Sequence, residues 1–214
     1  MNNEATYVQF GCAWSAPHGW RNFDASPTLR FERIPVIGKL YTKNDKRFPL
    51  NVAYGDITKG LPIIGASCDA VYCSHVLEHL SLDDCRVALR NTYKILKPGG
   101  VFRFVLPDLE YLIRLYTEAV QNRAPTPGLD FMRATGLGLE KRAYGIKGLV
   151  YSILGNSQHL WMWDYQSLVH ELEAVGFVNI KRVQFGDSTI HQFKEVENIS
   201  RWENCLGIEC AKQS

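Results

Sequence analysis

The stretch that most constrains the fold runs from Asp69 to Asp108 and reads DAVYCSHVLEHLSLDDCRVALRNTYKILKPGGVFRFVLPD. It starts with a short apolar run at residues 70–74, typical of a strand in a sheet that is covered on both faces. An amphipathic segment with helical spacing follows, and then a second apolar run at residues 101–106. Two strands joined by a helix predict a βαβ unit and hence a parallel sheet.

The helix in this unit carries its own start and stop signals. Ser81 can accept from the first-turn amides as N-cap, and Asp83 and Asp84 favour the positive end of the helix dipole. Pro98 lacks the amide that would continue the helix, so we expect the helix to end at about Lys97. Because crossovers between parallel strands are right-handed, both strands point their carboxyl ends to one edge of the sheet, where open α/β sheets bind ligands.

Three short strands are predicted before this unit, over residues 6–10, 20–23 and 52–54. Each is followed by a glycine or an acidic residue, namely Gly11, Asp24 and Asp56. The first connection is too short for a crossover helix, so a loop or a single turn is expected there.

The second half of the chain predicts helices and an antiparallel sheet edge. Asp108 can cap a helix that extends to about residue 122, and Asp164 one that runs from 165 to 175 before Gly176. Apolar runs at 177–185 and 206–211 suit two strands that pair antiparallel. A glycine-punctuated segment at about 123–160 suits helices at 131–137 and 142–154 and is a candidate lid. We therefore expect one domain, residues 1–214, with this insertion.

The composition is that of an ordinary soluble globular domain. The 214 residues carry a net charge of +2, so no strong basic field indicates a nucleic-acid partner. No apolar run suits a membrane span, and the first residues lack the pattern of a secretory signal. The six cysteines form no C-x-x-C pair, which favours free thiols, no metal site and a cytoplasmic location. Oligomeric state is not predicted.

Taken together, these residues resemble a class I methyltransferase domain that uses S-adenosylmethionine, in the group called type 11. The similarity covers almost the whole chain and is carried by FGCA at 10–13, PHGWRNFD at 17–24, GDI at 55–57, SHVLEHL at 74–80, LKPGG at 96–100, PD at 107–108 and HLWMWD at 159–164. The resemblance implies an α/β, Rossmann-like methyltransferase fold. Its sheet is mostly parallel and seven-stranded, with an antiparallel last strand.

The resemblance also implies a cofactor site at the strand tips. It places Gly11, Cys12 and Ala13 beside the methionine part of S-adenosylmethionine, although the family usually has glycine at the position of Ala13. Asp24 would accept from the ribose hydroxyls, as an acid after the second strand does in nucleotide folds. The remaining positions implied to contact the cofactor are Asp56 and Ile57 around the adenine and Ser74 and His75 near the sulfonium.

Methyl transfer is an in-line displacement, so the protein supplies alignment and, for a hydroxyl acceptor, a base. We predict His159, His75 and Asp108 as catalytic residues and favour His159, because the segment before it can fold over the cleft. The expected acceptor is a small molecule or a glycan precursor.

Two alternatives remain open at this point. One is a degenerate methyltransferase-fold protein that binds cofactor without turnover, since Ala13 departs from the family pattern. The other is a zinc hydrolase, because His75, Glu78 and His79 match the H-x-x-E-H order of inverted zinc peptidases. On a helix, its two histidines would share one face.

Overall fold

The computed structural model describes residues 5–36, 38, 46–141 and 158–214. One seven-stranded sheet lies at its centre, in the order β3-β2-β1-β4-β5-β7-β6. The strands are β1 Tyr7–Phe10, β2 Trp20–Asp24, β3 Val52–Tyr54, β4 Cys68–Ser74, β5 Leu96–Pro107, β6 Phe177–Val183 and β7 Cys205–Lys212. The α-helices are α1 Pro27–Glu32, α2 Leu82–Ile95, α3 Leu109–Gln121, α4 Pro127–Ala134 and α6 Tyr165–Val175.

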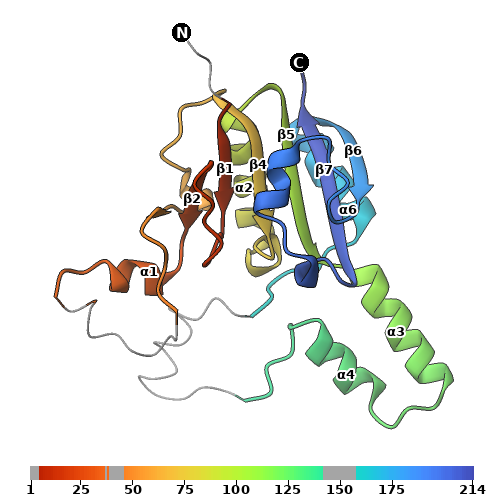
Figure 1. The fold of residues 1–214 in the computed structure, drawn as a ribbon. Helices are drawn as coiled ribbons and strands as arrows, with labels where there is room; N and C mark the ends of the chain where they lie inside the picture. Colours follow the sequence, from red (N-terminus) through yellow and green to blue (C-terminus); the bar gives the residue numbers. More distant parts are fainter. Residues whose placement is uncertain (1–4, 37, 39–45, 142–157) are drawn as a thin grey trace.

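The strand order places a switch point between β1 and β4. The chain leaves β1 toward β2 and β3 on one side and returns to β4 on the other, and all of these pairs are parallel. β7 runs antiparallel to both β5 and β6. Figure 1 shows α1 and α3 leaving the edge of the sheet at which β2 and β5 end, while the C-terminus lies at the opposite edge. A switch point at the carboxyl ends of parallel strands is the usual place for a ligand in such sheets.

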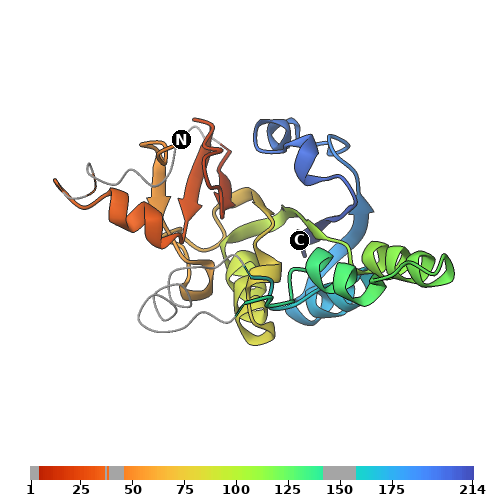
Figure 2. The same ribbon diagram turned by 90° about the horizontal axis from the view of Figure 1, so that it is seen from below.

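The two faces of the sheet are covered in different ways, as Figure 2 shows from below. Helices α2 and α6 pack on one face, where Leu89 and Leu168 join the larger apolar cluster. The opposite face is covered by the connection between β6 and β7, whose Phe193 and Trp202 pack against Tyr72 of β4. Residues 11–19 form a loop without helix. The β6–β7 connection therefore provides apolar cover on the face opposite α2 and α6.

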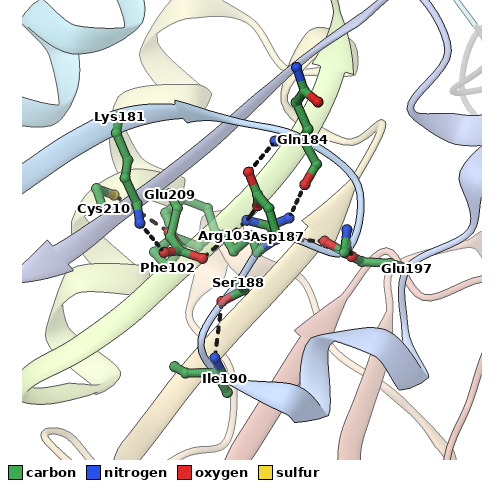
Figure 3. Close-up of polar contacts among 11 residues, drawn as sticks. Phe102, Arg103, Lys181, Gln184, Asp187, Ser188, Ile190, Glu197, Glu209 and Cys210 are labelled. Atoms are coloured by element: carbon green, nitrogen blue, oxygen red, sulfur yellow. Dashed lines mark hydrogen bonds and ion pairs between the residues drawn. The ribbon is translucent and has the colours of Figure 1, made fainter.

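Arg103 fixes this connection to the sheet (Figure 3). Its guanidinium is fully buried and bonds Glu197 at 2.5 Å, Asp187 at 3.0 Å and the Gln184 carbonyl at 2.6 Å. It also reaches Glu209 of β7 at 3.1 Å. A buried charge must be paired in this way, since an isolated one would cost several kcal/mol (about 3–5). The network holds the β6–β7 connection over the end of β4.

Most predicted elements are confirmed. The seven-stranded sheet forms with an antiparallel β7, Ser81 caps α2, Asp108 caps α3, and Asp164 and Gly176 bound α6.

Several predicted boundaries differ from the structure, and the strand predicted at 101–106 is longer, since β5 begins at Leu96. α2 ends at Ile95, before Lys97, because Leu96 already pairs with Cys68 in the sheet. The predicted helix at 131–137 is instead α4, which begins at Pro127 and ends before Gly136, a residue with φ of +68°. β6 ends at Val183 and not at residue 185. The predicted helix at 142–154 lies outside the described residues.

Candidate functional site

A cavity of about 560 Å³ opens at the carboxyl edge of the sheet, around the tips of β1, β2, β3 and β4. It collects residues that the sequence assigned to the cofactor: Gly11, Ala13, Asp24, Asp56, Ile57, Ser74 and His75. Cys12 instead lines an adjoining cavity of about 490 Å³ that shares Gly11 and Ser74 with the first. Burial and the charge of Asp24 raise the pKa of the Cys12 thiol to about 12, so it stays protonated.

The loop after β1 approaches the β4 tip closely. Gly11 has φ of +65°, and a Cβ placed on it would overlap the Val76 side chain. Ala13 also has a positive φ, 47°, a region in which a side chain is strained. Asp24 holds this turn, because its carboxylate accepts from the Ala13 amide at 2.9 Å and from the Ser26 amide at 2.7 Å. The acid after β2 thus organises the β1 loop in addition to lining the cavity.

Asp56 combines a capping role with a place in the cavity wall. One of its carboxylate oxygens accepts from the Thr58 amide at 3.0 Å and from the Thr58 hydroxyl at 2.7 Å, while the other lies 3.0 Å from Lys59 Nζ. Burial acts to raise its pKa, but the hydrogen bonds from Thr58 and Lys59 outweigh burial and lower it. Asp56 is therefore a carboxylate at neutral pH and can accept from a ligand.

At the β4 tip, Arg201 from the β6–β7 connection binds Ser74 through its side chain. Its guanidinium donates to the Ser74 hydroxyl at 2.9 Å and to the Ser74 carbonyl at 3.2 Å. The Arg201 carbonyl lies 2.9 Å from His75 Nε2. Arg201 lines both cavities, and no local sequence signal points to it because it lies far along the chain from Ser74.

His75 has a strained backbone, with φ of 53°, and both of its ring nitrogens are engaged. Nδ1 lies 3.1 Å from Glu78 Oε1, and Nε2 contacts Cys205 Sγ at 3.8 Å as well as the Arg201 carbonyl. Burial acts to lower the pKa of His75, but the contacts with Cys205, Glu78 and the Arg201 carbonyl outweigh it and raise the pKa to about 9. A histidine that is protonated at neutral pH cannot act there as a base.

The other two residues predicted as catalytic lie in different places. His159 is outside the cavity lining, but its ring packs edge-on against His79, which does line the cavity, with ring centroids 4.9 Å apart. Asp108 caps α3 through the Glu110 amide and lines a separate cavity of about 390 Å³ beside Arg182. The structure thus places His159 behind His79 in the wall of the main cavity and leaves Asp108 outside that cavity.

The zinc-peptidase alternative needs a helix that is not formed. Residues Leu77–His79 make a single 3-10 turn, which follows directly on β4 and precedes the Ser81 cap. His79 meets His159 and not His75. The H-x-x-E-H order in the sequence therefore does not produce two histidines on one helical face.

Comparison with known proteins agrees with this geometry. The family model for a methyltransferase domain matches residues 31–104. A SAM-dependent methyltransferase from Thermotoga maritima has a similar structure, with a TM-score of 0.53 and 17% identity over 98% of this chain and 83% of that chain. A structure of a Haloferax volcanii complex between the Trm112 methyltransferase activator and a methyltransferase gives a TM-score of 0.50 and 15% identity, over 99% of this chain and 84% of the other.

A third similar structure is a phosphoethanolamine N-methyltransferase from Haemonchus contortus, with a TM-score of 0.50 and 12% identity over 100% of this chain and 50% of that chain. No curated protein sequence matches the chain. At these identities the likeness to solved structures concerns the fold, and the domain match covers about a third of the chain. The chain therefore has the fold of these S-adenosylmethionine-dependent methyltransferases, and its residues 31–104 match the model of a methyltransferase domain.

Proposed function

We propose that the cavity at the carboxyl edge binds S-adenosylmethionine and that the chain transfers the methyl group to a small molecule or a glycan precursor. The observation that carries this proposal is the convergence of four strand tips on one cavity of about 560 Å³. A cavity of that size, between about 300 and 1,000 Å³, is typical of small-molecule and cofactor sites.

The proposed assignment of contacts follows the cavity wall. Asp24 accepts from the ribose hydroxyls and Asp56 from the adenine amine, while Ile57 packs against the base. Gly11 and Ala13 lie beside the methionine part, and Ser74 and His75 form the wall near the sulfonium. Arg201 contributes by holding Ser74, which it reaches through two hydrogen bonds.

Of the residues predicted as catalytic, we favour His159 as the base, because its ring packs against His79 in the cavity wall. Its Nδ1 bonds the Thr135 carbonyl at 2.7 Å, and since a carbonyl only accepts, Nδ1 carries the proton and Nε2 has a free lone pair. That nitrogen is a candidate base for an acceptor hydroxyl. We also propose that the chain has neither a nucleic-acid nor a membrane partner. Among the described residues, no helix is both long and apolar enough to cross a bilayer.

Calorimetric titration with S-adenosylhomocysteine tests the cofactor site. Binding in the micromolar range is expected for the wild type. Asp24→Asn and Asp56→Ala should each weaken it by about 1–3 kcal/mol, because each removes a carboxylate acceptor. Asp83→Ala is the matched control, since that acid is 94% exposed on α2. Absence of binding by the wild type would remove the cofactor assignment, and unchanged affinity in both variants would refute the placement.

A second candidate is a cofactor-binding protein without turnover, which the strained Ala13 favours. Incubation with methyl-labelled S-adenosylmethionine and pools of hydroxyl acceptors and glycan precursors separates the two. Label in an acceptor supports the enzyme. Cofactor binding with no label in any pool supports the second candidate.

A further inference from the structure

Glu78 is fully buried, yet neither of its carboxylate oxygens has a hydrogen-bond partner among the described residues. His75 Nδ1 lies 3.1 Å from Oε1, an ion-pair distance without the alignment of a hydrogen bond. Burying a carboxylate without hydrogen bonds costs several kcal/mol, so such groups are normally paired or bound to a metal ion. His75 pairs with this carboxylate at Oε1 only, so Glu78 keeps lone pairs that can accept a further partner.

Two imidazoles lie near this carboxylate. One ligand atom from each of Glu78, His79 and His159 lies within 4.8 Å of the other two. A tetrahedral ion with bonds of about 2.1 Å holds its ligand atoms about 3.4 Å apart, so the longest separation in this group has to shorten by up to about 1.4 Å to close around an ion. Among the described residues, this is the group of acid, histidine and cysteine side chains with that spacing.

Both histidines are already held in the tautomer that binds a metal. His79 Nδ1 lies 3.1 Å from the Gln158 carbonyl, and His159 Nδ1 lies 2.7 Å from the Thr135 carbonyl. Since carbonyls only accept, each Nδ1 carries a proton and each Nε2 presents a lone pair. Histidines that ligate metals almost always donate their other ring nitrogen to a carbonyl or carboxylate in this manner.

The backbone also fixes the three residues relative to one another. The Glu78 carbonyl accepts from the amides of Leu160 at 2.7 Å and Trp161 at 3.2 Å, which ties the His159 segment to the end of β4. Gly136 makes room for the His159 ring, because a Cβ there would lie 2.7 Å from His159 Nδ1. Ligands from two distant parts of the chain are thus preset without a metal.

We propose that Glu78, His79 and His159 bind one divalent transition-metal ion, of which Zn²⁺ is the representative. Two imidazoles and one carboxylate are the donor set of several catalytic zinc sites and of open non-haem iron sites. Three protein ligands leave at least one position open. His79 lines the proposed cofactor cavity, so the ion would lie next to that cavity. This ion goes beyond the metal-free site expected from the sequence, and its ligand set differs from the His75–His79 pair of the peptidase motif.

The proposal assigns His159 a different role from that of a base, because a nitrogen that ligates a metal cannot also take a proton. Titration of chelator-treated protein with Zn²⁺ in a calorimeter tests it without any cofactor or acceptor. One ion per chain is expected for the wild type. His79→Ala and His159→Ala should each bind at least about 10- to 100-fold more weakly, as loss of even an outer partner costs that much.

The matched control is His170→Ala, since that histidine is exposed on α6 and outside the cluster. Its affinity should equal that of the wild type. If a variant fails to fold, the wild type alone still decides: added Co²⁺ should give the visible absorption of a nitrogen- and oxygen-bound ion without thiolate charge transfer. No stoichiometric ion, equal affinity in folded ligand variants, or a thiolate band would each overturn the proposal. Failure of the cofactor titration would leave this result unaffected.

Discussion

Arg103 and Glu209 are directly opposite each other in the β5–β7 ladder, and their side chains meet at 3.1 Å inside the protein. The same guanidinium bonds Glu197 and Asp187 in the connection that covers the second face of the sheet. Through that connection the pair reaches the cavity, because Arg201 on it holds Ser74. The Arg103–Glu209 contact in the sheet therefore helps to hold the connection that supports the Ser74 wall of the cavity.

Arg103→Met should destabilise the protein by about 3–5 kcal/mol, because Glu197 would be left as a buried, uncompensated charge. Urea unfolding at neutral pH measures this. The control is Arg86→Ala, which breaks a partly exposed ion pair with Glu171 on helices and should cost about 1 kcal/mol or less. Similar losses in the two variants would contradict the buried role of Arg103.

The free energy of unfolding should also decrease at low pH, because Glu209 becomes protonated there. Burial acts to raise its pKa, but hydrogen bonds from Lys181 and Ser188 and the charge of Arg103 outweigh it and lower the pKa below its usual value. A lowered folded-state pKa gives stability that is present above the unfolded pKa of about 4.5 and is lost as pH falls through the folded value.

Glu209→Gln removes this titration. The variant should be less stable than the wild type at pH 7 and should lose less stability between about pH 5 and pH 3. Unfolding free energies from urea titrations at several pH values give both slopes. Parallel slopes in wild type and variant would show that Glu209 does not titrate as inferred.

Gly11→Ala should cost about 2–4 kcal/mol, since it adds left-handed strain and an overlap with Val76. It should also weaken binding of S-adenosylhomocysteine, because the β1 loop must move. Urea unfolding and calorimetry measure the two effects.

Ala13→Gly is the opposite test in the same loop. Ala13 has φ of 47°, so replacing it with glycine relieves backbone strain of about 1–2 kcal/mol. The greater conformational entropy of glycine in the unfolded chain costs about 0.5–1 kcal/mol and offsets part of this gain. We expect a small gain in stability of up to about 1 kcal/mol and unchanged or tighter cofactor binding. A clear loss of stability would show that the methyl group of Ala13 has a packing role.

Helix ends were predicted well where the residues that fix them are neighbours in the sequence. Asp164 and Gly176 bound α6 at the predicted residues, because caps depend only on the backbone within one turn. Lys97 was the expected end of α2, but pairing of Leu96 with Cys68 ends the helix earlier. A long-range contact of that kind has no local sequence signature.

The site shows the same division. The tips of β1 to β4 were predicted because parallel strands share a carboxyl edge, and they gather in one cavity. Arg201 was missed because only tertiary structure brings it to Ser74. The meeting of His79 with His159 was missed for the same reason, although both residues had been singled out separately.

Arg201→Ala should separate positioning at the cavity from stability. Arg201 is exposed, so its loss should change the unfolding free energy by no more than about 1 kcal/mol. It removes both donors from Ser74, and cofactor affinity should fall by about 0.5–1.5 kcal/mol, or roughly 2- to 10-fold, because the Ser74 hydroxyl is no longer oriented. Calorimetry with S-adenosylhomocysteine measures the change.

The control is Arg133→Ala on α4. The Arg133 guanidinium pairs with Glu140, and this variant should bind the ligand as the wild type does. Equal affinities in Arg201→Ala and Arg133→Ala would mean that Ser74 does not contact the ligand, and the cofactor would then have to lie farther toward β3.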